Sequence, residues 1–104
     1  MKKEFHKFVT VISLFELESG IAQSQNPDRE KKKIINALKN QTVIVLDEKS
    51  ASLAGEIDDF LYKEGAPIDP EDCMIAGIAK HYNQPILTRD KHFQRIKDVK
   101  VETY

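Results

Sequence analysis

The chain has 104 residues, of which 40% are apolar and 32% charged, the composition of one globular domain over residues 1–104. The chain has 16 Lys and Arg residues and 17 Asp and Glu residues, so no overall positive charge indicates a nucleic-acid-binding protein. The longest apolar run, Phe8–Phe15, is too short for a membrane span, which takes about 20 residues. The single cysteine, Cys73, predicts a small buried side chain in a reducing, cytoplasmic protein without disulfides.

The first half of the chain predicts one strand and two helices. Residues 8–12 (FVTVI) have the composition of a strand buried on both faces. Ser13 followed by Glu16 fits a capping box, which predicts a short helix from about residue 14 to 23. Asn26 and Pro27 predict the start of a helix that runs to about residue 40. Three aliphatic side chains of this second helix are expected to be buried: Ile34, Ile35 and Leu38.

A second apolar strand, residues 42–46 (TVIVL), leads to a longer helix. Asp47 is its expected N-cap, and Gly65 is expected to end it. Five of its side chains are predicted to face inward: Leu53, Ala54, Ile57, Phe60 and Leu61.

The last third predicts one more helix and two strands. Asp69 and Pro70 open the helix, and Asn83 ends it in the left-handed conformation. The remaining expected elements are a strand at 85–88 (PILT), a helical turn at about 91–96 and a strand near 99–102.

This alternation predicts an α/β fold of three layers, a mainly parallel sheet of about four strands with helices on both faces. In such sheets ligands bind at the carboxyl ends of the strands. Three carboxylates follow strands or lie in first helical turns: Glu16, Asp72 and Asp90. Clustered carboxylates are costly unless a cation neutralises them, and oxygen ligands suit Mg²⁺ or Mn²⁺. We therefore expect a metal site.

Each carboxylate also fits a purely structural role. Glu16 is the acidic partner of Ser13 in the capping box. Asp72 favours the dipole of its helix wherever its side chain points. Asp90 can cap the turn at 91–96. The two kinds of role can coexist, and the residues leave the choice open.

The order of these segments resembles the PIN domain, specifically the VapC-type toxin ribonucleases, over residues 8–104. TVISLFELESG is similar to the family's second-strand motif, whose conserved Glu is matched by Glu16. IDPEDCMIAGIAKHYNQPILTRDKHFQRI is similar to the stretch in which an Asp opens an Ile- and Ala-rich helix and a strand ends in Thr-x-Asp. Asp72, Thr88 and Asp90 match those positions, whereas His92 stands where many members carry a further Asp.

The resemblance implies an endoribonuclease in which clustered carboxylates hold Mg²⁺ or Mn²⁺ ions that activate water against an RNA phosphodiester. It makes Glu16, Asp72 and Asp90 catalytic metal ligands, with the Thr88 hydroxyl beside them. It also implies an antitoxin protein as partner and a homodimer. The alternative is a catalytically silent PIN-like module that binds an antitoxin or another chain.

One departure from the family lies at the start of the chain. The family begins with a hydrophobic strand that bears its first catalytic Asp, and only MKKEFHK precedes the strand at 8–12. We therefore expect an N-terminally truncated fold with a gap in mid-sheet, where unpaired backbone groups cost about 1–3 kcal/mol each. Three explanations are open. The flanking strands pair directly with each other, a partner chain supplies the missing element, or the chain is a fragment whose start codon was placed too late. All three favour self-association, most simply as a dimer.

Basic side chains in the C-terminal half can serve an RNA backbone, and ordinary solvated surface is the competing interpretation. They are Lys80, His81, Arg89, Lys91, His92, Arg95, Lys97 and Lys100. The mixed run Asp28–Lys33 is interpreted as a solvated helix face.

Overall fold

Strand β1 (Phe8–Thr10) continues without a loop into helix α1 (Val11–Ala22) in the computed structural model, which describes residues 8–87 and 91–102. Thr10 is the N-cap, because its hydroxyl accepts a hydrogen bond of 3.0 Å from the backbone N–H of Ser13. The predicted capping box of Ser13 with Glu16 is therefore wrong. The helix begins three residues earlier than expected, which places Glu16 beyond its first turn.

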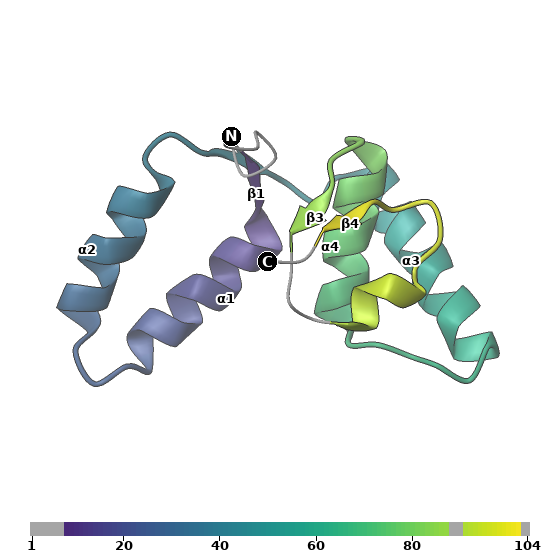
Figure 1. The fold of residues 1–104 in the computed structure, drawn as a ribbon, viewed down its shortest axis with the longest axis horizontal. Coiled ribbons are helices and arrows are strands. Elements are labelled where there is room, and N and C mark those ends of the chain that lie inside the picture. Colours follow the sequence, from purple (N-terminus) through teal and green to yellow (C-terminus); the bar gives the residue numbers. More distant parts are fainter. Residues whose placement is uncertain (1–7, 88–90, 103–104) are drawn as a thin grey trace.

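Helix α2 (Pro27–Leu38) begins where the sequence predicts. The side chain of Asn26 accepts a hydrogen bond from the backbone N–H of Arg29 at 3.2 Å. The helix packs against α1 as a hairpin at the outer edge of the molecule (Figure 1). Helix α1 covers only one side of α2. Ile35 is 58% exposed, so its predicted burial is wrong.

Helices α3 (Glu48–Lys63) and α4 (Pro70–His81) form the most extensive helix pair and hold the core. The predicted ends are confirmed at Gly65 and Asn83, which have φ angles of 74° and 54°. Phe60 is 39% exposed, so its expected inward position is wrong. The buried cluster joins α3 and α4 to the C-terminal segment and contains Ile57, Leu61, Ile68, Cys73, Ala76, Ala79, Ile86, Phe93 and Ile96.

All four predicted strands are present, and every pairing between them is parallel. β1 pairs with β2 (Thr42–Ile44), and β3 (Ile86–Leu87) pairs with β4 (Val101–Glu102). They form two separate two-stranded sheets, which corrects the expected single sheet. Within the described ranges no pairing joins β1 to β3, so these strands do not close the predicted gap by pairing directly.

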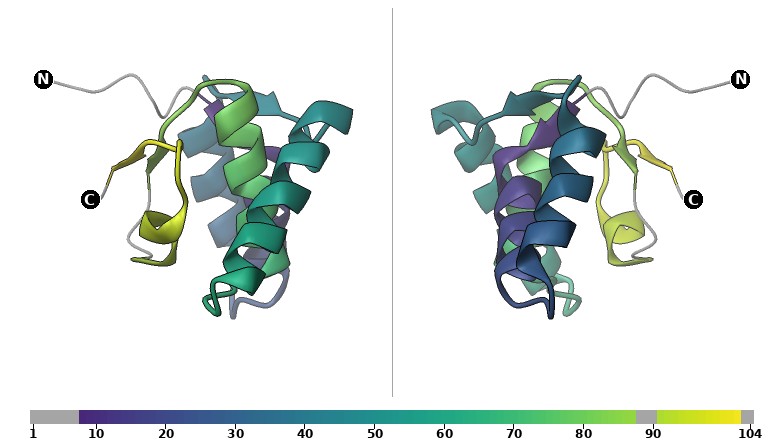
Figure 2. Two further views of the ribbon diagram at one scale, coloured as in Figure 1. Left: turned by 90° about the vertical axis from the view of Figure 1, so that its right-hand side faces the viewer. Right: turned by 90° about the vertical axis from the view of Figure 1, so that its left-hand side faces the viewer.

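The C-terminal segment lies on one side of the helices (Figure 2). It consists of β3, the 3₁₀ helix η2 (Lys91–Arg95) and β4. Among residues 8–87 and 91–102, no helix combines the length and apolar character needed to cross a membrane.

The close approach of α3 and α4 depends on Gly77. A Cβ atom at this position would lie 2.4 Å from the carbonyl oxygen of Ser50 and 2.8 Å from the backbone nitrogen of Ala54. Ser50 is fully buried at the same contact. The absence of a side chain on Gly77 therefore allows the backbones of the two helices to touch.

We expect Gly77→Ala to lower the free energy of unfolding by about 1–3 kcal/mol, because the added methyl group forces two helix backbones apart. Gly55→Ala is the matched control, since a Cβ there meets nothing within 4 Å. The free energy of unfolding of that control should rise by about 0.5–1 kcal/mol, because Ala has a higher helix propensity than Gly. Urea denaturation measures both, and equal stability of the two variants would contradict the role of Gly77.

Candidate functional site

Asp72 lies in the first turn of α4 and is half-buried. The helix begins at Asp69, whose backbone carbonyl accepts hydrogen bonds from the N–H groups of Asp72 and Cys73 at 3.0 and 3.2 Å. The side chain of Asp69 makes no capping hydrogen bond, so only the backbone part of its predicted cap is confirmed. Asp72 is thus held on a helix that packs into the core through Cys73 and Ala76.

Glu16 is exposed on α1, next to Phe15, whose side chain is 64% exposed. Helix α1 contacts α4, so the elements that carry Glu16 and Asp72 are neighbours in the fold. Asp90 and Thr88 lie outside the described residues. Among residues 8–87 and 91–102, no group of three His, Cys, Asp or Glu side chains could hold a metal ion. The three-carboxylate site therefore remains a prediction.

A fourth carboxylate, Asp47, also follows a strand but is fully engaged as a helix cap. It accepts hydrogen bonds from the backbone N–H and hydroxyl of Ser50 at 2.9 and 2.7 Å, and from the Tyr82 hydroxyl at 2.7 Å. These donors, with His81 Nε2 at 3.6 Å, hold the pKa of Asp47 far below its usual value. The same bond raises the pKa of Tyr82. The cap was predicted, whereas the contact with Tyr82, 35 residues away, has no local sequence signal.

Cys73 is 2% exposed, as predicted for a core cysteine. Burial and the Asp58 carboxylate, which lies 3.8 Å from the thiol sulfur, raise the Cys73 pKa to about 11. Burial and the raised pKa both disfavour a role for this thiol as a nucleophile.

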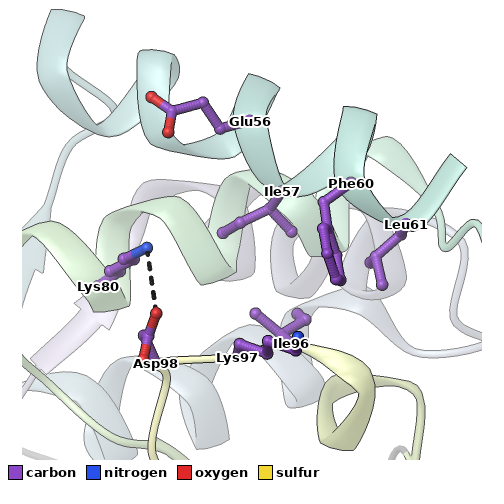
Figure 3. Close-up of a pocket in the computed structure, with 8 residues that line it drawn as sticks. All are labelled: Glu56, Ile57, Phe60, Leu61, Lys80, Ile96, Lys97 and Asp98. Carbon is purple, nitrogen blue, oxygen red and sulfur yellow. Dashed lines mark ion pairs between the residues drawn. The ribbon is translucent and has the colours of Figure 1, made fainter. Parts of the chain in front are cut away.

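Several basic side chains of the C-terminal half make contacts within the protein (Figure 3). Lys80 pairs with Asp98 at 4.0 Å, and Lys97 Nζ lies 4.9 Å from the centre of the Phe60 ring. Both contacts border a cavity of about 200 Å³ between α3, α4 and the segment after η2. The residues that line this cavity are Glu56, Ile57, Phe60, Leu61, Lys80, Ile96, Lys97 and Asp98.

Arg95 is also engaged, because its guanidinium donates a hydrogen bond of 3.5 Å to the carbonyl of Ala66. With His81 beside Asp47, four of the eight predicted RNA-facing cations thus take part in intramolecular contacts. In Figure 3 the Lys80–Asp98 pair and the aliphatic side chains face the same cavity. Three of these contacts, those of Lys80, Arg95 and Lys97, link the C-terminal segment to the rest of the protein.

The helices and the parallel strand pairing define an α/β protein. The sequence matches the PIN domain over residues 2–99, and the chain therefore belongs to the PIN domain family. It is similar to the tRNA(fMet)-specific endonuclease VapC of Shigella flexneri, with 30% identity over 97 residues, 92% of this chain and 74% of that protein. The corresponding endonuclease of Salmonella typhimurium is 29% identical over 97 residues, with the same coverage.

Solved structures show the same similarity. DNA-bound VapBC from Salmonella typhimurium superposes with a TM-score of 0.86 and 29% identity, covering 92% of this chain and 74% of that chain. VapBC2 from Rickettsia felis, bound to a DNA fragment from its promoter, superposes with a TM-score of 0.87 and 26% identity. This match covers 92% of this chain and 73% of that chain. The predicted PIN-like fold is therefore confirmed.

We expect Tyr82→Phe to destabilise the protein at pH 7, with a smaller difference from wild type above about pH 10. Asp47 has a folded-state pKa far below its unfolded value of about 4, so it stays ionised in the folded protein at pH 3 and still accepts the hydrogen bond from Tyr82 there. Tyr82 has a folded-state pKa above its unfolded value, so its contribution is lost as pH rises above about 10.

Urea unfolding at pH 3, 7 and 10.5 measures the stability difference. Tyr62→Phe is the control, since Tyr62 is 74% exposed and its substitution should have no effect at any pH. A Tyr82→Phe difference that disappears at pH 3, or that is as large at pH 10.5 as at pH 7, would contradict the hydrogen bond to an Asp47 that stays ionised in acid.

Proposed function

We propose that this protein is a metal-dependent endoribonuclease of the VapC type, with a homodimeric assembly and an antitoxin protein as partner. Glu16, Asp72 and Asp90 bind Mg²⁺ or Mn²⁺, and the Thr88 hydroxyl lies beside them. The observation that carries the proposal is the position of Asp72, half-buried at the start of a rigid core helix. The endonuclease names of the curated relatives support RNA, and specifically tRNA, as the substrate class.

The chemistry of the described donors fits a hard divalent cation. Glu16 and Asp72 offer carboxylate oxygens, which Mg²⁺ and Mn²⁺ prefer. They lie on α1 and α4, two helices in contact. Cys73 follows Asp72 directly but is only 2% exposed and packs in the core, so its thiol does not face solvent as a competing soft ligand.

A bound divalent ion would lower the pKa of water and stabilise charge on the attacked phosphodiester. The residues of the chain would hold the ion and orient the groups that react. The backbone of Asp72 is held in the first turn of α4, because its N–H bonds to the Asp69 carbonyl. The N-terminus of α4 favours negative charge, which suits both an ionised Asp72 and an approaching phosphate. Glu16 is exposed, so a polymeric substrate can reach it.

Exposed apolar surface supports the proposed protein partners. Phe15 on α1 is 64% exposed, and Ile35 on α2 is 58% exposed. Val43 in β2 is 43% exposed, and Val45, just after this strand, is 54% exposed. Within the described residues, β1 and β3 each have one pairing edge without a neighbouring strand. Such edges and apolar side chains are typical sites of chain association.

The alternative proposal is a catalytically silent module that binds a partner chain. It is favoured by one observation, that the described carboxylates do not by themselves gather into a metal-binding group. Under this alternative Asp72 keeps only its structural role at the helix start.

We expect Asp72→Asn to reduce Mn²⁺-dependent cleavage of tRNA at least about 100-fold, because loss of one ligand charge weakens metal binding and charge stabilisation. Glu71→Gln is the matched control, since Glu71 is exposed and precedes Asp72 on the same turn. Gel analysis of labelled tRNA measures cleavage, and calorimetric titration with Mn²⁺ measures binding.

Equal cleavage by wild type and Asp72→Asn would contradict the proposed site. Absence of cleavage by the wild type, together with Mn²⁺ binding that is the same in the two proteins, would favour the silent module.

A further inference from the structure

Four cations form a stripe along one face of α2. Arg29, Lys32 and Lys33 lie within the helix, and Lys39 is its C-cap residue, which keeps helical backbone angles. The spacings of three, four and ten residues place all four within about a third of the helix circumference. All four side chains are exposed. We refer to Arg29, Lys32, Lys33 and Lys39 as the basic stripe.

The basic stripe faces away from the rest of the protein. The opposite face of α2 carries Ile34 and Leu38, which are half-buried where the helix packs against α1. In residues 8–87 and 91–102 only one member of the stripe forms an ion pair, Lys33 with Glu30 at 3.4 Å. The stripe is therefore available to a partner along its whole length.

Helix stability does not explain the N-terminal part of the stripe. Arg29 lies in the first turn of α2, where the helix macrodipole disfavours a positive charge. Asp28 and Glu30 in the same turn do have the favourable sign. A cation that costs the helix stability, and that makes no ion pair within the described residues, suits the binding of an external anion.

Charge is segregated between two helices although the net charge of the chain is only -1. Residues 27–39, at α2, carry five cations and two carboxylates, whereas residues 48–64, at α3, carry five carboxylates and two lysines. The cations of the C-terminal half largely contact other groups of the protein, as in the Lys80–Asp98 pair. Among helices α1 to α4, α2 therefore carries the largest excess of positive charge.

We infer that the basic stripe binds the phosphodiester backbone of the RNA substrate. This inference rests on the proposed function for the identity of the polyanion. Ten residues of helix rise about 15 Å, long enough for the stripe to contact several successive phosphates. The stripe begins beside the α1–α2 turn, on the same side of the molecule as the start of α4, where Asp72 lies (Figure 1). Because the stripe lies on the outer face of α2, an RNA strand bound to it would pass around the α1–α2 turn to reach the carboxylates.

The test compares Arg29→Gln/Lys32→Gln with the control Lys49→Gln/Lys63→Gln. Both double variants remove two positive charges from a helix and include one from the first turn, but the control changes α3. Binding of fluorescent tRNA(fMet) is measured by anisotropy in EDTA, without cleavage, at several KCl concentrations. We expect the stripe variant to bind about tenfold more weakly at 100 mM KCl. Its slope of log affinity against log salt should be shallower by about 1.5, with the control within twofold of wild type.

Circular dichroism should show the stripe variant to be at least as helical as wild type, because Arg29 opposes the helix dipole. Equal tRNA affinity of the stripe variant and wild type would overturn the inference, as would an equal loss in the control. Failure of the wild type to bind tRNA at 50 mM KCl would also overturn it. So would a wild-type oligomer that dissociates in the stripe variant while tRNA affinity is unchanged, since the stripe would then bind a second copy of the chain.

Failure of the inference and failure of the proposed function give different results. If the stripe variant binds tRNA normally while Asp72→Asn abolishes cleavage, the nuclease stands and the stripe has no part in substrate binding. If binding depends on the stripe but no cleavage occurs with Mn²⁺, the inference stands as RNA binding and the catalytic proposal fails.

Discussion

The contact between α3 and α4 at Gly77 is the constraint on which the rest of the structure depends. Because Gly77 has no side chain, the α4 backbone lies against Ser50 and Ala54 of α3. This closeness lets a few medium-sized aliphatic residues fill the core between α3, α4 and the C-terminal segment. It also brings Tyr82 at the end of α4 to Asp47 at the start of α3, so one hydrogen bond joins opposite termini of the helix pair. The orientation of α4, and with it the position of Asp72, follows from this packing.

Local chemistry made much of the fold predictable. Asn26 and Asp47 cap helices as their side chains predict, and Gly65 and Asn83 end them in the left-handed conformation. These signals depend on residues within a few positions of each other. The start of α1 was missed for a related reason, because Thr10 and Ser13 can both cap and the local sequence does not rank them. The bond of the Thr10 hydroxyl to the Ser13 N–H shows which one does.

Non-local features were not predictable in the same way. The burial of Ile35 depends on whether anything packs on the outer side of α2, which its apolar spacing cannot report. The division of four parallel strands into two sheets depends on tertiary placement, since each strand alone has the composition of a buried central strand. The candidate site was predictable as a set of residue types, and α1 and α4 do bring Glu16 and Asp72 onto neighbouring helices. Three members of the basic stripe lie in the run Asp28–Lys33, which was interpreted as a solvated helix face.

The short strands determine how the two halves of the molecule are joined. β1 and β2 have three residues each, and β3 and β4 have two, whereas isolated two-stranded sheets are at best marginally stable in water. The sheets must therefore take their stability from the helices that flank them. No described strand links β1 to β3, and the contact between α1 and α4 is one of the contacts that place Glu16 relative to Asp72. A helix contact of this size constrains two carboxylates less tightly than a shared sheet would. A strand that paired with the open edges of both β1 and β3 would join the two sheets directly through backbone hydrogen bonds.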